Sequence, residues 1–284
     1  MQILHKQNNK ALELKRDDKA LSITFIGTGS AFTKKFYQNN ALVVKEDEHI
    51  LIDCGTRTPE ALSKLGLSVT NIKNYLITHS HADHIGGLEE VMLMYRYMAH
   101  SRGTMIAPKK YRKLLWQESL KGGASYNEIN DGKYLQFEDM WDTIELKAVK
   151  NADRELCTTR LGSLSIAMLR TMHIPNSALD WKSSALSYGV ILDEKVFFTS
   201  DTLYDPGLLD LVLGRYKIGA IFHDCQLYSG GVHASFDELS GLPEEIREKM
   251  YLMHYGDNVE DFEQTALDRG FKGFVKPWQS YVFN

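Results

Sequence analysis

Three histidines and an aspartate crowd into positions 79–84 of this 284-residue chain, and no other feature limits its fold and chemistry as strongly. In an extended segment, residues two apart point to the same side, so His79 and His81 should present their imidazoles to one point, as zinc ligands do. Asp83 and His84 should point to different sides and reach a second point. Two ions about 3.5–4 Å apart need this many donors, and such a pair is a clamp for phosphoester hydrolysis.

Further donors each follow an apolar segment that is predicted to be a strand. His173 follows residues 164–169, Asp201 follows residues 196–200, and His254 follows residues 251–253. Ligands at strand ends are held by rigid elements, as a metal site requires. A lone histidine in such a place is more often structural, and it is the complete cluster at 79–84 that favours a metal site.

Predicted strands and helices are mixed along the whole chain, which favours a layered α/β arrangement. One helix should begin at Thr58 as N-cap with Pro59 in its first turn, and it should end at Gly66. The segment 121–132 should be a loop, and residues 1–20 should be a short extra strand or a loose arm. Further strands are predicted at 21–26, 41–44, 50–52, 75–77, 185–192, 195–199 and 218–222, and further helices at 88–99, 108–120, 243–249 and 259–269.

Charge and cysteine content narrow the function classes. Lys and Arg number 33 against 37 Asp and Glu, a net charge of −4, which disfavours a nucleic-acid surface although a local patch would survive the averaging. The widely spaced Cys54, Cys157 and Cys225 suit a reducing compartment. The chain shows neither the apolar core of a signal peptide nor a stretch of about 18 apolar residues, so a cytoplasmic protein without a membrane span is expected.

The run T-H-S-H-A-D-H-I-G-G, after L-I-D-C-G and before F-F-T-S-D-T, resembles the metallo-β-lactamase-fold hydrolase superfamily from Leu21 to about Tyr255. The resemblance implies one domain over residues 1–284 with a four-layer αββα sandwich, and two zinc ions at one edge, with manganese as an alternative. Asp53 is similar to the family's buried motif aspartate, which orients ligands, although by composition it could equally cap a turn. The implied ligands are His79, His81 and His173 for the first ion, Asp83, His84 and His254 for the second, and Asp201 as the bridge.

A second group of residues resembles the phosphodiesterase branch of this superfamily, which includes ribonuclease Z. There an acidic residue and a later histidine donate a proton to the leaving alkoxide, and the matching positions are Asp224 and His233. An acidic partner raises the pKa of a histidine and fixes its tautomer. The alternative is that Asp224 caps a turn and His233 is solvated. For His223, packing next to a ligand and a role in catalysis are about equally well supported. Asp83 is counted with Asp224 and His233 among the expected catalytic residues.

The stretches L-L-W-Q-E-S-L-K-G-G, G-G-V-H-A-S-F-D-E-L and L-P-E-E-I-R-E-K-M-Y-L-M-H-Y are similar to the anti-Pycsar proteins, zinc phosphodiesterases that destroy cyclic mononucleotide immune signals. This resemblance implies a homodimer that acts on cyclic CMP and cyclic UMP, with cyclic AMP and cyclic GMP as further substrates. A small nucleotide needs a stacking surface, for which Phe32, Phe36 and Tyr37 are candidates, although core packing would also explain each. His223 before Asp224 and the longer first 20 residues depart from the group's pattern.

Two other functions stay open at this point. A ribonuclease Z-type endonuclease that processes tRNA 3′ ends should carry a Gly/Pro/Lys-rich arm, which is not found, and the negative net charge removes its usual long-range attraction to RNA. A metal-stabilised protein that binds a nucleotide without turnover is the other alternative, and the complete donor set argues against it. β-Lactamase activity is disfavoured by the extra ligand His254, by Asp201 as a bridge without a cysteine, and by the pair Asp224 and His233. Glyoxalase-type thioester hydrolysis is possible on this scaffold, but the proton donor would be superfluous there.

Overall fold

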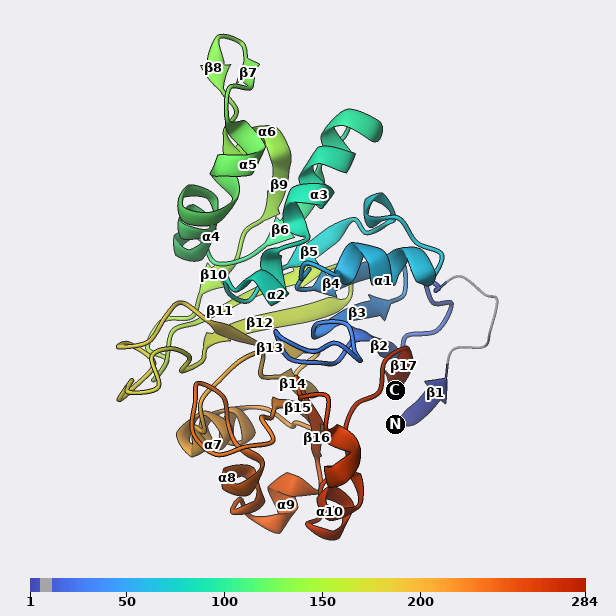
Figure 1. Cartoon of the computed structure of the whole chain (residues 1–284), viewed down its shortest axis with the longest axis vertical. Helices are drawn as coiled ribbons and strands as arrows, with labels where there is room; N and C mark the ends of the chain where they lie inside the picture. Colours follow the sequence, from blue (N-terminus) through green and yellow to red (C-terminus); the bar gives the residue numbers. More distant parts are fainter. Residues whose placement is uncertain (6–11) are drawn as a thin grey trace. The chain divides into compact units, whose positions relative to one another are not determined.

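The computed structural model describes residues 1–5 and 12–284, and its elements are labelled in Figure 1. The described chain divides into two compact units. Unit 1 comprises residues 1–27, 37–146 and 278–284, and unit 2 comprises residues 28–36 and 147–277. Each unit is built around one mixed β-sheet, in agreement with the predicted α/β class. The prediction of a single domain over residues 1–284 stays a prediction.

Unit 1 contains an eight-stranded sheet in the order β1-β17-β2-β3-β4-β5-β6-β9. Pairing is antiparallel from β1 to β4 and parallel from β4 to β9. Every residue of β2 is buried, Ser22 and Thr24 as well as the apolar residues with which they alternate. The strands are β1 Gln2–His5, β2 Leu21–Gly27, β3 Asn40–Lys45, β4 Glu48–Ile52, β5 Asn74–Leu76, β6 Gly103–Ile106, β9 Trp141–Ile144 and β17 Gln279–Phe283.

The helices of unit 1 correct two expectations. Helix α1 has Arg57 rather than Thr58 at its N-cap, because the Thr58 hydroxyl accepts a hydrogen bond from Asn40 Nδ2 (2.9 Å) instead. The segment predicted as a loop over 121–132 begins with helix α5 and enters a β7–β8 hairpin that projects beyond α5 and α6 (Figure 1). The remaining bounds are α1 Thr58–Lys64, η1 Val69–Asn71, α2 Ala82–Ile85, α3 Leu88–Leu93, η2 Met94–Met98, α4 Lys109–Leu115, η3 Trp116–Leu120, α5 Lys121–Ser125, β7 Ile129–Asn130, β8 Lys133–Tyr134 and α6 Phe137–Met140.

Unit 2 contains a seven-stranded sheet in the order β10 to β16. Its pairing is antiparallel from β10 to β14 and parallel from β14 to β16. The strands are β10 Lys147–Ala148, β11 Leu156–Leu161, β12 Leu164–Arg170, β13 Tyr188–Leu192, β14 Val196–Phe198, β15 Ala220–Asp224 and β16 Met250–Met253. The helices are α7 Pro206–Arg215, α8 Phe236–Ser240, α9 Glu244–Arg247, η4 Val259–Phe262 and α10 Glu263–Asp268.

In both sheets the parallel strands end next to buried polar residues. Asp53 follows β4, Asp224 is the last residue of β15, and His254 follows β16; each is at most 2% exposed. The carboxyl ends of neighbouring parallel strands meet at one sheet edge, which is where α/β proteins bind ligands. The fold therefore gathers the chemistry-bearing residues of each unit at one end of its sheet.

The expected extra strand or arm at the N-terminus is part strand. Gln2–His5 forms β1, which pairs antiparallel with β17, whereas residues 6–11 lie outside the described part of the chain. Within residues 1–5 and 12–284, no helix has the length and apolar character needed to cross a membrane.

Candidate metal centre

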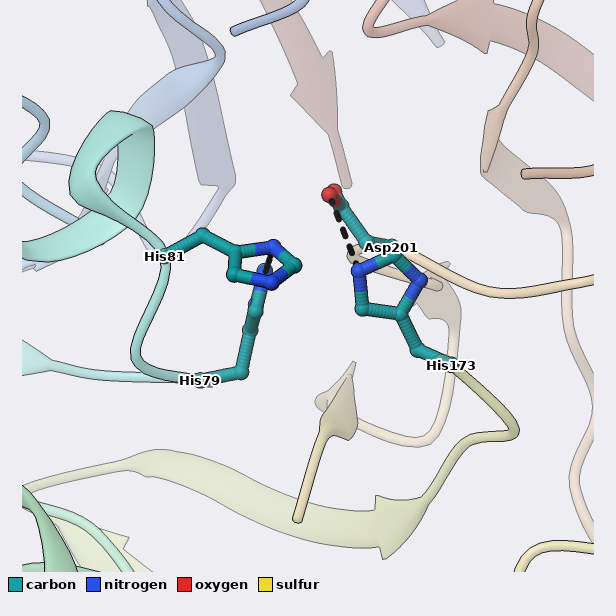
Figure 2. Close-up of side chains that lie close together, drawn as sticks. All are labelled: His79, His81, His173 and Asp201. Atoms are coloured by element: carbon teal, nitrogen blue, oxygen red, sulfur yellow. Dashed lines mark hydrogen bonds and ion pairs between the residues drawn. The ribbon is translucent and has the colours of Figure 1, made fainter. Parts of the chain in front are cut away.

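In unit 1, the segment that follows β5 carries the first pair of histidines (Figure 2). His79 Nε2 and His81 Nδ1 lie 3.1 Å apart, so both imidazoles are turned to one point, as their spacing predicts. The backbone of His81 is extended, with φ −76° and ψ 150°, and it is the N-cap of α2. His79 is 3% exposed. Two nitrogen donors that converge in this way can supply two of the ligands of a tetrahedral zinc ion.

Asp83 and His84 are arranged differently from the expectation that they point to different sides. His84 Nε2 and Asp83 Oδ2 lie 3.3 Å apart, and the ring centroids of His84 and His79 lie 4.1 Å apart. The reason is that the chain turns helical at Ala82, so the two-residue alternation of an extended segment no longer applies. The side chains of Asp83 and His84 therefore come together and both are buried, as is His79, whereas His81 is half-buried.

Asp53 holds this cluster in place from the end of β4. Its carboxylate accepts hydrogen bonds from Thr78 N (2.9 Å) and Thr78 Oγ1 (2.7 Å) and contacts His84 Nδ1 at 2.7 Å. Burial raises the pKa of Asp53, and the neighbouring His84 and Thr78 oppose that rise. A hydrogen bond from His84 Nδ1 to this carboxylate leaves Nε2 as the ring's lone-pair donor, which is the tautomer a metal ligand needs.

The backbone around Asp53 is shaped for this contact. Asp53 adopts φ +61°, an uncommon conformation that turns the chain at the strand end. A Cβ on Gly55 would lie 2.0 Å from the carbonyl oxygen of Asp83. Only glycine therefore allows this segment to pass so close to α2, and this close passage brings Asp53 beneath His84.

In unit 2, Asp201 is the central carboxylate. It lies in the turn after β14 and is 1% exposed. His173 Nε2 lies 3.9 Å from Asp201 Oδ2 (Figure 2), and His254 Nε2 lies 3.5 Å from the same oxygen. His173 Nδ1 is 2.9 Å from the carbonyl oxygen of Val232, so a donated Nδ1–H turns the Nε2 lone pair toward Asp201.

These separations fit a cation between the groups. They exceed the length of a direct N–H···O hydrogen bond. Two ligand atoms bound tetrahedrally to zinc at about 2.0–2.2 Å are roughly 3.3–3.5 Å apart, close to the His254–Asp201 separation. One ligand atom from each of Asp201, Asp224, His233 and His254 lies within 4.8 Å of all the others. A buried carboxylate faced by imidazole nitrogens is a donor set that suits zinc.

Asp224, the last residue of β15, holds two of these rings. His233 Nδ1 lies 2.7 Å from Asp224 Oδ2, and His254 Nδ1 lies 3.2 Å from Asp224 Oδ1. Thr202 N donates to the same carboxylate at 3.0 Å. Burial alone would raise the pKa of Asp224, but the adjacent His233 and His254 together outweigh it and the pKa is lowered. Conversely, burial would lower the pKa of His233, and the Asp224 carboxylate raises it.

His223 is placed apart from this proton chemistry. Its Nδ1 lies 2.7 Å from the backbone carbonyl oxygen of Asp224, and the side chain is 1% exposed. Burial lowers the pKa of His223, which favours its neutral form. The ring therefore acts on the backbone of Asp224 rather than on its carboxylate.

Comparison with known proteins identifies the family. The family model described as "Anti-Pycsar protein Apyc1" matches residues 21–281. The chain belongs to the anti-Pycsar Apyc1 family. An Apyc1 protein of Bacillus phage vB_BsuM-Goe3 is 41% identical over 251 residues, which cover 84% of this chain and 91% of that protein. An Apyc1 protein of Paenibacillus harenae is 35% identical over 262 residues, covering 92% and 99%.

Solved structures confirm the predicted metallo-β-lactamase fold. The metallo-β-lactamase-fold protein YhfI from Bacillus subtilis has a TM-score of 0.66 and 15% identity, over 93% of this chain and all of its own (100%). The short form of human tRNase Z has a TM-score of 0.62 and 17% identity, over 93% and 99%. At these identities the likeness concerns the fold alone.

The three aromatic residues considered for stacking have different surroundings in this Apyc1 family member. Phe36 packs edge-on against Tyr255, with ring centroids 5.2 Å apart. The guanidinium of Arg57 lies over the ring of Tyr37, 4.8 Å from its centroid. Phe32 is 87% exposed. Of the three, Phe32 has the ring surface that is most open to a ligand.

The sequence reasoning missed the groups that orient the donors. Thr78 supplies two of the hydrogen bonds to Asp53, Thr202 N binds Asp224, and the carbonyl oxygen of Val232 faces His173. The position of Thr78, between β5 and the histidines, was a usable signal. The backbone groups of Thr202 and Val232 carry no signal, because any residue type offers them.

Proposed function

We propose that this chain is a di-metal phosphodiesterase that hydrolyses 3′,5′-cyclic mononucleotides to nucleoside monophosphates and thereby counters cyclic-nucleotide antiphage signalling. Cyclic CMP and cyclic UMP are the expected substrates, with cyclic AMP and cyclic GMP as further ones. The observation that carries the proposal is the Asp224 carboxylate between His233 and His254. A phosphodiesterase needs a metal ligand and a proton donor side by side, and this carboxylate orients one of each.

The proposed ligands follow the family resemblance. Three of these ligands are supported by contacts within their own units, since Asp53, Val232 and Asp224 leave the Nε2 of His84, His173 and His254 as the metal-binding atom. Two bound Zn²⁺ or Mn²⁺ ions would activate water and neutralise charge on the phosphate oxygens. The residues that would hold the ions are His79, His81 and His173 for one, Asp83, His84 and His254 for the other, and Asp201 for both.

His233 is the proposed general acid. Its Nδ1 faces Asp224 Oδ2 at 2.7 Å, so the carboxylate stabilises the imidazolium and directs Nε2–H away from itself. When the phosphorus–oxygen bond of the ring breaks, the leaving ribose oxygen takes the proton from Nε2. A positioned acid of this kind contributes typically 10²–10⁴-fold to the rate.

The test is a panel of the four 3′,5′-cyclic mononucleotides, incubated with protein loaded with zinc or manganese and scored for linear monophosphate. A pre-tRNA with a 3′ trailer is the control substrate for the endonuclease alternative, and His233→Ala is the control protein. Linear product from at least one nucleotide, at a rate at least 10²-fold above that of His233→Ala, is expected. Absence of product with all four would falsify the proposal, and trailer cleavage instead would support the tRNA function.

The family resemblance also leads us to propose a homodimer that acts in the cytoplasm, where cyclic nucleotide signals are read. Light scattering during size-exclusion chromatography should give about twice the mass of one chain, and a monomer would contradict this part of the proposal.

A further inference from the structure

The segment from Thr28 to Phe36, in unit 2, is fastened along its length to the residues that follow β16. His254 N donates to the carbonyl oxygen of Thr28 (2.9 Å), and Ser30 N donates to that of Tyr255 (2.9 Å). Gly29 and Tyr255 form a parallel β-bridge. The first residue of the segment therefore hydrogen-bonds directly to the backbone of His254, a proposed metal ligand.

Asp257 fastens the far end of the same segment. Its carboxylate accepts hydrogen bonds from Thr33 Oγ1 (2.5 Å), Lys34 N (2.9 Å) and Lys35 N (3.1 Å). Thr33 Oγ1 in turn accepts a hydrogen bond from Phe36 N at 3.1 Å. The Asp257 carboxylate thus accepts hydrogen bonds from three consecutive residues. Charge-assisted hydrogen bonds of this kind are about twice as strong as neutral ones.

The turn held in this way carries an exposed aromatic residue and an exposed cation. Phe32 is 87% exposed, and Lys34 is exposed as well. A Cβ on Gly29 would lie 2.6 Å from the Thr33 side chain, so the chain returns tightly on itself before Thr33. An exposed ring on a fixed turn suits base stacking, because little conformational freedom is lost when a base binds.

We propose that Asp257 is a positioning residue that fixes the Phe32–Lys34 turn so that the Phe32 ring stacks on the nucleobase of the substrate. The inference rests on the proposed function and adds to it a residue that determines affinity for the base. Asp257 acts through the turn and does not touch the reacting atoms. Its removal should therefore affect recognition of the base and leave the chemical step intact.

The experiment compares Asp257→Ala, Phe32→Ala and the double variant on a cyclic nucleotide that the wild type hydrolyses and on an abasic ribose 3′,5′-cyclic phosphate. Stacking on one aromatic ring is worth roughly 1–3 kcal/mol, so each single variant should raise KM for the nucleotide about 10-fold with little change in kcat. The double variant should be no worse than either single one, since both changes remove the same contact. KM and kcat for the abasic substrate should not change.

Asp261→Asn is the matched control, because it removes a nearby exposed negative charge. Hydrogen exchange gives a readout that needs no substrate: the amides of Lys34 and Lys35 should lose protection in Asp257→Ala and keep it in Asp261→Asn. Unchanged KM in Asp257→Ala, additive effects in the double variant, or an equal loss on the abasic substrate would each overturn the inference. A wild type inactive on every cyclic nucleotide would instead overturn the proposed function.

Discussion

Replacing Asp224 by asparagine should damage catalysis and metal binding together. The carboxylate is fully buried (0% exposed) and faces His233 Nδ1 at 2.7 Å and His254 Nδ1 at 3.2 Å. A hydrogen bond to a charged group contributes about 1.5–3 kcal/mol. Loss of the His233 contact alone therefore lowers the rate by roughly 10- to 150-fold, at 1.36 kcal/mol per tenfold. Misplacement of His233, the proposed general acid, should lower the rate further, toward 10³-fold.

The second effect concerns His254. Partners that orient a metal ligand typically contribute 10- to 100-fold to metal affinity, so Asp224→Asn should bind its metal that much more weakly. His233→Ala separates the two effects, because it should lose turnover and keep the ions. The measurements are kcat at saturating zinc and metal content by mass spectrometry after dialysis against a weak chelator. Asp224→Asn with kcat within threefold of the wild type, or His233→Ala depleted of metal, would refute the reasoning.

Three further outcomes are expected. Asp201→Ala should lose metal as well as activity, and elemental analysis that still finds two ions would contradict the bridging role. Asp53→Ala leaves three buried atoms of Thr78 and His84 without their acceptor. At about 1–3 kcal/mol per buried group, the free energy of unfolding in urea should fall by roughly 3–9 kcal/mol, and an unchanged value would contradict it. Burial lowers the pKa of His49, whose Nε2 accepts a hydrogen bond from a backbone N–H (2.9 Å). The stability that the neutral imidazole contributes is therefore present above about pH 6.5 and is lost as the pH falls. His49→Gln should lose less stability than the wild type between pH 7.5 and 5.5, and equal losses in both proteins would exclude this role.

Much of the fold could be predicted because its strands are apolar runs and its turns are marked. The hairpin predicted around the Asp193-Glu194 turn is found as β13 paired with β14, and both turn residues adopt positive φ, at +51° and +57°. The Gly/Asn-rich composition of 121–132, with Gly122 and Gly123 at its start, predicts a loop where the structure has a helix and a hairpin. Neither glycine has a positive φ, and both lie inside α5. Glycine has a low helix propensity, but this weak local preference is overridden by the structure around α5.

Donor residue types could be predicted, but their directions could not. The alternation that correctly paired His79 with His81 failed one residue later, because a four-residue helix starts at Ala82. Short helices give too few residues for a periodic pattern to identify them. The hydrogen bonds of Asp257 to residues 33–35 could not be predicted for another reason. These partners are 222 to 224 residues away in the chain, and no local pattern marks such a contact.

The attachment of donors to strand ends has a consequence for how sequences of this kind can diverge. The positions of Asp53, Asp224 and His254 are set by the ladder pairing of β4, β15 and β16, and the length of the connecting loops does not enter. Segments such as the β7–β8 hairpin can be lengthened, shortened or exchanged without shifting any of these three residues. Drift in the connections can thus alter what surrounds these residues while each of them keeps its place at the end of the strands of its own sheet.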